Sequence, residues 1–234
     1  MSNFPLAPAS ISDTNELGHL IALAYKNNPI QRTLMPFTLR GAYWGAWLAH
    51  DFLRAGEVYF NTGYHVCSSS KIVAFAKVRY PGPVDSKGDF EGELPEGTDM
   101  KILGHWFENI DAYHEKHASY EKDYCIPSSP PTSPFPSPNP TQTPCQVLKL
   151  TANPDLHVLC VHPSYQRQGL GKKLLTRFLA DADKEHARVY LQATALGHPL
   201  YVRCGWVDVE DMVTRTPEGA VVWKCMMREP GAGE

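Results

Sequence analysis

One short segment of the sequence has the residue types that bind a phosphate group. It reads Gln166-Arg167-Gln168-Gly169-Leu170-Gly171-Lys172 and lies between an apolar run and an amphipathic stretch. Glycines where a strand passes into a helix let the backbone approach a ligand, and the free N–H groups of the helix start attract anions. Each charge-assisted hydrogen bond there contributes about 1.5–3 kcal/mol, so three or four would hold a pyrophosphate firmly.

The two commonest nucleotide-binding loops do not fit this segment. A P-loop needs a glycine five residues before Gly171 and a Ser or Thr after Lys172, where the chain has Gln166 and Lys173. A dinucleotide loop needs a third glycine at the position of Leu174. Taken alone, the two glycines are also compatible with a tight turn that binds nothing.

A second motif about thirty residues later supports the ligand-binding interpretation. The pattern Val161-x4-Gln166-x2-Gly169-x-Gly171 resembles the acetyl-CoA signature of the GNAT superfamily of N-acetyltransferases. The run Pro199-Leu200-Tyr201-Val202-Arg203-Cys204-Gly205-Trp206 resembles that family's second motif, Leu-Tyr-x-x-x-Gly-Phe, with Trp206 in place of the commoner Phe. The resemblance covers residues 150–228 well, and the first helix and the strand near Phe75 more loosely.

The resemblance implies a mixed α+β fold of the α/β class, the GNAT-like fold. Its central sheet is mixed, mostly antiparallel, splayed at its middle and flanked by helices, and acetyl-CoA lies in the gap. By analogy the pantetheine arm meets backbone groups of Leu159, Cys160 and Val161. The cofactor-binding residues for the pyrophosphate are then Gln166, Arg167, Gln168, Gly169, Leu170, Gly171 and Lys172. Lys173 or Arg177 would reach the ribose phosphate.

The resemblance also implies catalytic roles. In the family the tyrosine at position 201 protonates the departing CoA thiolate, and its alternative role here is to pack the short helix. A base is expected six residues before Val161, where the chain has Asp155 instead of Glu. His157 lies two residues further on the same strand face and titrates near neutral pH. Each also has a plain alternative, a solvated turn residue for Asp155 and a satisfied strand histidine for His157. His162 and His198 are weaker candidates.

Neither a cysteine nucleophile nor a metal is expected. The amine attacks the thioester directly in this family, so we interpret Cys160 and Cys204 as core residues. The six cysteines contain no CxxC pair, and His114 and His117 are three residues apart where a zinc helix needs four.

The composition is that of an ordinary soluble protein. The chain has 234 residues, 43% of them hydrophobic and 20% charged, with a net charge of −3 from 22 basic and 25 acidic residues. Without a basic surplus we expect no nucleic-acid partner. No apolar run is long enough to span a bilayer and the start does not resemble a secretory signal, so we expect no membrane partner and a cytoplasmic protein.

The elements that position these motifs follow from periodicity. A helix is predicted from the capping-box-like Asp13–Glu16 to the Asn28-Pro29 stop, and a second over 37–53. Strands are expected at 57–60, 64–68, 71–80, 156–161, 189–192, 206–213 and 220–227, with helices at 99–122, from 170 to about 185 and 199–204. The strand at 156–161 is expected to be central and buried on both faces.

We therefore expect one acetyltransferase domain over 1–234, with a disordered Pro/Ser-rich insertion at about 125–146, where 127–144 contains eight of the 20 prolines. The expected activity is acetyl transfer from acetyl-CoA, as co-substrate, to the primary amine of a small-molecule acceptor. A protein or peptide amine, either a lysine or an N-terminus, and a non-catalytic acetyl-CoA-binding module are the alternatives. An aromatic acceptor pocket would be formed by residues that serve equally well as core: Tyr25, Tyr43, Trp44, Trp47 and Trp223.

Overall fold

The computed structural model describes residues 4–53, 61–79, 96–119, 122–126 and 158–232. The helices are η1 (Ile11–Asp13), α1 (Thr14–Ala24), α2 (Pro29–Leu34), α3 (Phe37–Leu53), α4 (Met100–His117), η2 (Pro163–Tyr165), α5 (Leu170–Lys184) and α6 (His198–Arg203). The strands are β1 (Leu6–Pro8), β2 (Asn61–Ser68), β3 (Lys71–Arg79), β4 (Tyr124–Ile126), β5 (Leu159–Val161), β6 (Val189–Ala193), β7 (Val207–Thr216) and β8 (Gly219–Arg228).

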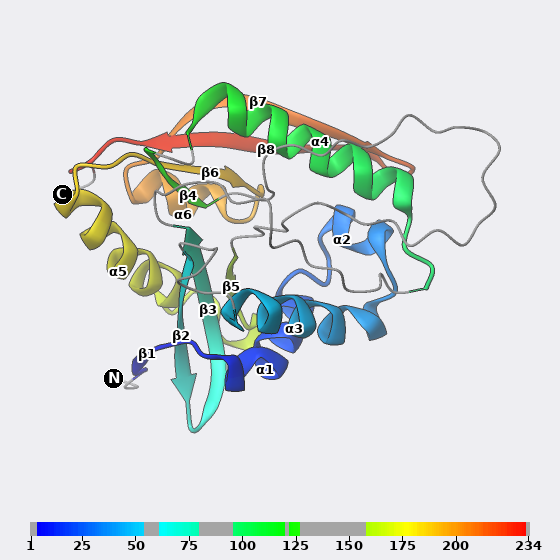
Figure 1. Cartoon of the computed structure of the whole chain (residues 1–234), viewed down its shortest axis with the longest axis horizontal. Coiled ribbons are helices and arrows are strands. Elements are labelled where there is room, and N and C mark those ends of the chain that lie inside the picture. The colour runs from blue at the N-terminus through cyan, green and yellow to red at the C-terminus, as the bar shows by residue number, and fades with distance from the viewer. Residues whose placement is uncertain (1–3, 54–60, 80–95, 120–121, 127–157, 233–234) are drawn as a thin grey trace.

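The described strands form one sheet that opens at its middle. Its order is β1-β2-β3-β4-β6-β8-β7, and β5 pairs with β3 outside this path. All pairings are antiparallel except the parallel pairing of β4 with β6. The short β4 meets β3 through one residue pair, Arg79 and Cys125. Because β5 and β6 are not paired with each other, the sheet splays between them, which confirms the expected fold class (Figure 1).

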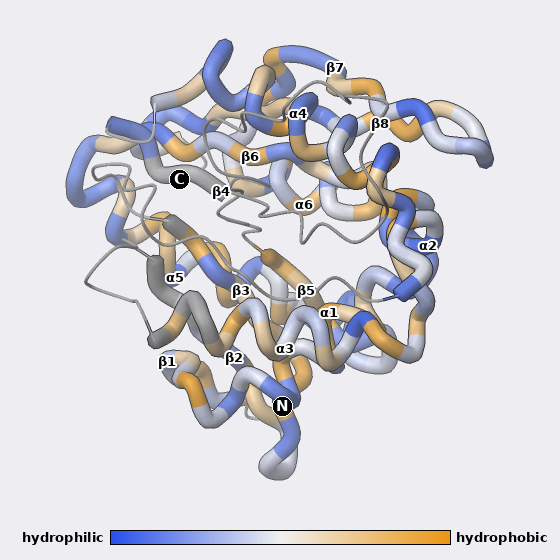
Figure 2. Tube along the Cα trace, turned by 45° about the vertical axis from the view of Figure 1, so that its right-hand side comes forward, coloured by the Kyte–Doolittle hydropathy of each residue, from blue (hydrophilic) through white to orange (hydrophobic). Residues whose placement is uncertain are grey.

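Three apolar clusters fix the helices on the two halves of the sheet. Figure 2 shows α1 and α3 beside β3 and β5 in one half, and α4 beside β6 and β8 in the other. Alternate residues of β3 serve opposite faces, because Phe75 packs with α1 and α3 whereas Ala76 packs with α5. Helix α4 covers β6, β7 and β8 through Trp106 and Ile110. Helix α2 lies between α3 and α4 (Figures 1 and 2).

Most expected elements are present, and the departures have physical reasons. The helix expected to continue to residue 122 ends at His117. The predicted first helix corresponds to α1, which ends at Ala24, and the unpredicted α2 begins at the expected stop, Pro29. In the strand expected over 156–161, the described part is Leu159–Val161, and only Cys160 of these three is fully buried. The strand buried along its whole length is β6 instead. The strand expected at 57–60 lies outside the described residues, as does the insertion except for Cys125 and Ile126 in β4.

The acidic residues expected to cap the first helix have other partners. Asp13 accepts hydrogen bonds at 2.8 Å from the backbone N–H and the hydroxyl of Ser10, which begins η1. Glu16 accepts a 2.7 Å hydrogen bond from the Ile72 amide and so ties α1 to β3. The capping pattern predicted the correct start of the helix, but Glu16 bonds to β3 instead of capping the N-terminus of α1.

None of the helices in the described ranges is long and apolar enough to cross a membrane. Within the same ranges, no three His, Cys, Asp or Glu residues gather in a way that would hold a metal ion.

Candidate active site

Hydrogen bonds between β3 and β5 show which peptide groups of β5 are paired with β3 and which are not. The His162 amide donates to the Val73 carbonyl and the Lys77 amide to the Val158 carbonyl, both at 2.8 Å. Hydrogen-bonded pairs recur at every second residue of an antiparallel ladder. Cys160, midway between His162 and Val158, is thus in the same phase, and its peptide groups face β3.

Leu159 and Val161 have the opposite phase, so their peptide groups face the gap between β5 and β6. Two side chains contact their carbonyls, because Tyr25 Oη donates to Leu159 O at 3.1 Å and Gln166 Nε2 donates to Val161 O at 3.2 Å. Among the described residues, nothing accepts a hydrogen bond from the two amides. An interior strand edge with free amides is suited to an extended ligand that carries amide groups of its own.

The loop between β5 and α5 has a backbone suited to an anion. Arg167 and Gly169 have positive φ values of 64° and 79°, and Gly169 precedes the first residue of α5 without a side-chain cap. The first amides of α5 therefore lack partners within the helix and point out of its end. A Cβ atom on Gly169 would meet no described residue within 4 Å, so the described structure is open at this point of the loop. A diphosphate fits this arrangement.

Several basic residues near this loop are held by the protein itself. Lys173 Nζ donates to the carbonyl of Phe4. Arg177 donates to Asp181 at 2.7 Å and to the Tyr64 hydroxyl at 3.0 Å. The two residues considered for the ribose phosphate are therefore bound to other groups, whereas Arg167 and Lys172 in the loop are exposed.

Helix α6 presents the predicted acid, Tyr201, in a buried position. The residue is 8% exposed, and its ring makes an edge contact with Trp206 at 5.6 Å between centroids. The indole N–H of Trp206 in turn donates to Val189 O at 3.0 Å, which fixes the ring to the start of β6. No described residue forms a hydrogen bond with the Tyr201 hydroxyl, and burial raises the pKa of Tyr201 well above 10.

Three titratable side chains meet where β5, α1 and α6 come together. Tyr25, Cys160 and Tyr201 interact electrostatically with one another. Burial is the main cause that raises the pKa of each of these groups, so all three are protonated at neutral pH. Cys160 is thus a protonated core thiol. The arrangement brings a protonated phenol to the gap-facing edge of β5.

Of the four residues considered as bases, the structure describes two. Asp155 and His157 lie outside the described residues. His198 Nε2 is 2.7 Å from Asp208 Oδ1, at hydrogen-bond distance. His162 Nδ1 accepts a 3.2 Å hydrogen bond from the Ser164 amide, and burial, then Lys71, lowers the pKa of His162.

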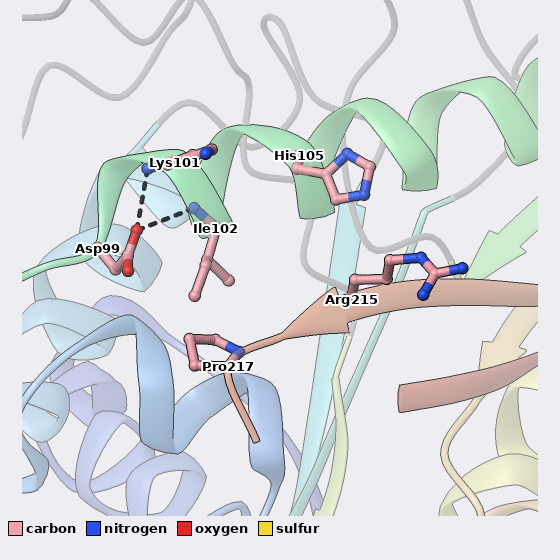
Figure 3. A pocket seen from close by; sticks show the side chains of 6 residues that line it. All are labelled: Asp99, Lys101, Ile102, His105, Arg215 and Pro217. Atoms are coloured by element: carbon pink, nitrogen blue, oxygen red, sulfur yellow. Dashed lines mark hydrogen bonds between the residues drawn. The ribbon is translucent and has the colours of Figure 1, made fainter. Parts of the chain in front are cut away.

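The aromatic residues considered for an acceptor pocket divide between two clusters. Tyr25, Tyr43, Trp44 and Trp47 belong to the cluster of α1 and α3, and Trp223 belongs to that of α4. A separate pocket of about 340 Å³ opens between the start of α4 and the end of β7 (Figure 3). Its lining contains none of the predicted site residues and consists of Asp99, Lys101, Ile102, His105, Arg215 and Pro217.

Sequence reasoning missed the contribution of α1 and the start of α3. Tyr25 was considered only as pocket wall, whereas its hydroxyl contacts the strand edge itself. Arg40 was not singled out, although its side chain is 97% buried, at 3% exposure. A tyrosine one turn before the Asn28-Pro29 stop was the only available signal for Tyr25, and an arginine within an aromatic helix was the signal for Arg40.

Comparisons with known proteins agree with this geometry. Residues 146–217 match the family model described as an acetyltransferase (GNAT) domain. No curated protein matches the sequence.

Solved structures with the same fold include acetyltransferases from distant organisms. One is the PaiA N-acetyltransferase of Thermoplasma acidophilum in complex with coenzyme A, with 11% identity, a TM-score of 0.52, and coverage of 97% of this chain and 99% of that one. Another is a Corynebacterium glutamicum protein described as histone acetyltransferase HPA2 and related acetyltransferase, with 17% identity, a TM-score of 0.53, and coverage of 99% and 98%. At these identities the likeness concerns the fold.

Proposed function

This chain is a member of the GNAT superfamily of acetyltransferases, and from that premise we propose that it transfers the acetyl group of acetyl-CoA to the primary amine of a small molecule. The observation that carries the proposal is the free edge of β5. The amides of Leu159 and Val161 face the gap without partners among the described residues, in the strand that precedes the uncapped start of α5. A pantetheine arm and a diphosphate occur in this order in coenzyme A.

The residues present fit the coenzyme at both ends of this path. Leu159 and Val161 offer two amide donors to the pantetheine arm, and the backbone amides from Gln168 to Lys172 offer donors to the diphosphate. The side chain of Leu170 is 3% exposed and packs in the core, so this residue contributes through its backbone. Arg167 and Lys172 add positive charge at the rim.

Bound acetyl-CoA supplies the acetyl thioester, and this chain supplies proton transfers. The new C–N bond forms as the C–S bond breaks, so the amine must lose a proton and the sulfur must gain one. An amine with a pKa of about 10.4 costs roughly 4.6 kcal/mol to deprotonate at pH 7, which makes a base useful. Asp155 and His157 remain our predicted bases.

Tyr201 is the proposed acid for the sulfur. Its raised pKa keeps the hydroxyl protonated, and the described residues leave that proton unused. The adjacent Cys160 acts as an internal probe of thiol chemistry, because burial raises its pKa as well. Desolvation at this place therefore disfavours both a thiolate and a phenolate, so it acts in the same direction on the leaving thiolate and on its proposed acid.

The test uses purified protein, acetyl-CoA and a panel of amines, with CoA release as the readout. We expect turnover with small amines, and Tyr201→Phe should lower kcat by roughly 100-fold or more while acetyl-CoA binding by calorimetry is retained. Tyr113→Phe, on α4, is the matched control. Turnover only with peptide amines would replace the small-molecule acceptor, and binding without turnover on any amine would leave a coenzyme-binding module.

A further inference from the structure

Arg40, in the first turns of α3, has a buried guanidinium that is largely unsatisfied. The side chain is 3% exposed. Its Nε donates to the Met35 carbonyl at 3.0 Å, but its buried Nη1 has no hydrogen-bond partner. No carboxylate of the described residues forms an ion pair with it. Buried arginine is otherwise found with an anion, because its charge cannot be removed by deprotonation.

The surroundings of Arg40 add positive charge. Lys26 Nζ and the Arg40 guanidinium both contact the ring of Phe37, at 5.4 and 5.7 Å from its centroid. Burial lowers the pKa of Arg40, and so does the like charge of Arg32. The neighbouring Arg32 already pairs with Glu218, at 3.1 Å.

The same face of α3 presents more donors without acceptors. Trp44 and Trp47 follow Arg40 at helical spacing and are 2% and 0% exposed. The indole N–H of each lacks a hydrogen-bond partner. Three buried donors in line on one helix face thus lack oxygen atoms to receive them, whereas native interiors pair nearly all such groups.

This face lies next to the proposed reaction centre. Tyr25, whose hydroxyl contacts Leu159 at the strand edge, directly precedes Lys26, which shares the Phe37 ring with Arg40. Helix α2 lies between the helices of the two sheet halves (Figure 1). A group held at Arg40 would therefore lie near the end of α1, whose Tyr25 contacts the strand edge.

We infer that Arg40 binds a carboxylate of the acceptor, so that the substrate class is an amine that also carries a carboxylate. The inference rests on the proposed function and makes it more specific. A planar guanidinium with free N–H groups binds a carboxylate through two parallel hydrogen bonds, which an uncharged amine cannot offer. Arg40 is a binding residue in this scheme and takes no part in the proton transfers.

Matched pairs of acceptors test this directly, each pair being an amino acid and its decarboxylated amine: lysine with cadaverine, arginine with agmatine and tyrosine with tyramine. For at least one pair we expect the wild-type kcat/KM to favour the carboxylate member by tenfold or more. Arg40→Met should remove this preference, and Arg40→Lys should retain part of it. Equal rates for both members of every pair, or an unchanged preference in Arg40→Met, would overturn the inference.

Two further measurements separate a binding role from a structural one. Removal of an unpaired buried charge should leave the urea midpoint of Arg40→Met unchanged or raised, whereas a large loss would mean that Arg40 serves the fold. Arg32→Gln is the matched control, because this exposed arginine is already paired, and it should keep the preference within about threefold.

Binding distinguishes failure of this inference from failure of the proposed function. Calorimetry of the same pairs against protein loaded with CoA needs no turnover, and it should show tighter binding of the carboxylate member in wild type only. If turnover is absent but this difference is present, the acetyl-transfer proposal fails and the carboxylate site stands. If turnover is present and the difference is absent, the carboxylate-site inference fails and the acetyl-transfer proposal stands.

Discussion

Gly171 lies directly against the side chain of Leu200. A Cβ atom at position 171 would be 2.9 Å from Leu200 Cδ2, a distance that real Cβ contacts do not reach. The absence of a side chain on Gly171, in the first turn of α5, thus leaves room for Leu200 of α6. Since Leu200 precedes Tyr201, this contact joins the proposed diphosphate site to the helix of the proposed acid.

Gly171→Ala should therefore disturb both sites together. We expect a loss of about 1–3 kcal/mol in unfolding free energy by urea denaturation, because the added methyl group overpacks a tight contact, together with a lower kcat. Leu200→Ala in the same chain should restore part of the stability by making room. Additive losses in the double variant would contradict this explanation.

Gly169→Ala should behave differently, although it lies two residues away. Its Cβ would meet nothing, so the cost is backbone strain at φ 79°, about 1 kcal/mol. We expect a raised KM for acetyl-CoA as the loop amides shift, with kcat nearly unchanged. Steady-state kinetics with varied acetyl-CoA measures both values, and a fall in kcat at constant KM would argue against a binding role.

Trp206→Phe would introduce the residue commoner at this position of the motif, and we expect it to be harmful here. The Trp206 indole N–H donates to the buried Val189 carbonyl at 3.0 Å, and phenylalanine cannot replace that donor. The expected loss is about 1–2 kcal/mol of unfolding free energy. A lower kcat should accompany it, because the edge contact that holds Tyr201 changes. Thermal or urea unfolding of the variant beside wild type provides the check.

Low pH should lower the stability of the folded protein, because it protonates Asp183 near the C-terminal end. Hydrogen bonds from Arg228, at 2.6 and 2.9 Å, and from the Gly231 amide lower the pKa of Asp183. A carboxyl whose pKa is lower in the folded state contributes stability above its unfolded pKa of about 3.9, and this contribution disappears as the pH falls through the folded value.

Asp183→Asn should remove that contribution at neutral pH. It leaves the guanidinium of Arg228, a residue only 2% exposed, without its carboxylate, so we expect a loss of about 3 kcal/mol at pH 7. Near pH 2 the variant and wild type should converge in urea midpoint. A constant difference between them from pH 7 to pH 2 would show that the interaction is not electrostatic.

The sequence predicted the elements whose signals are local. The bounds of α3, Phe37–Leu53, agree with its apolar periodicity, and the strand, loop and helix around Gly169 follow from two motifs. Elements that depend on distant partners were missed. β1 and β4 have three residues each and are strands only because β2, β3 and β6 lie beside them.

Within the site, residue type alone could not reveal phase or burial. Leu159, Cys160 and Val161 are alike as apolar residues, and only the register with β3 separates the two that face the gap from the one that does not. No sequence pattern identified Arg40, because its burial and its lack of a carboxylate partner among the described residues depend on what surrounds it in the fold. The pairing of Lys173 with Phe4 likewise joins residues 169 positions apart.

The three-residue strand β4 has a mechanical consequence. It links the two half-sheets, and among the described residues it forms one residue pair with β3 and three with β6. Little backbone bonding opposes a change in the angle between the halves on the β3 side. The packing of the surrounding helices accordingly helps to hold β5 and β6 apart, so we expect a substitution on α1, α2 or α4 to alter affinity for the proposed coenzyme without touching it.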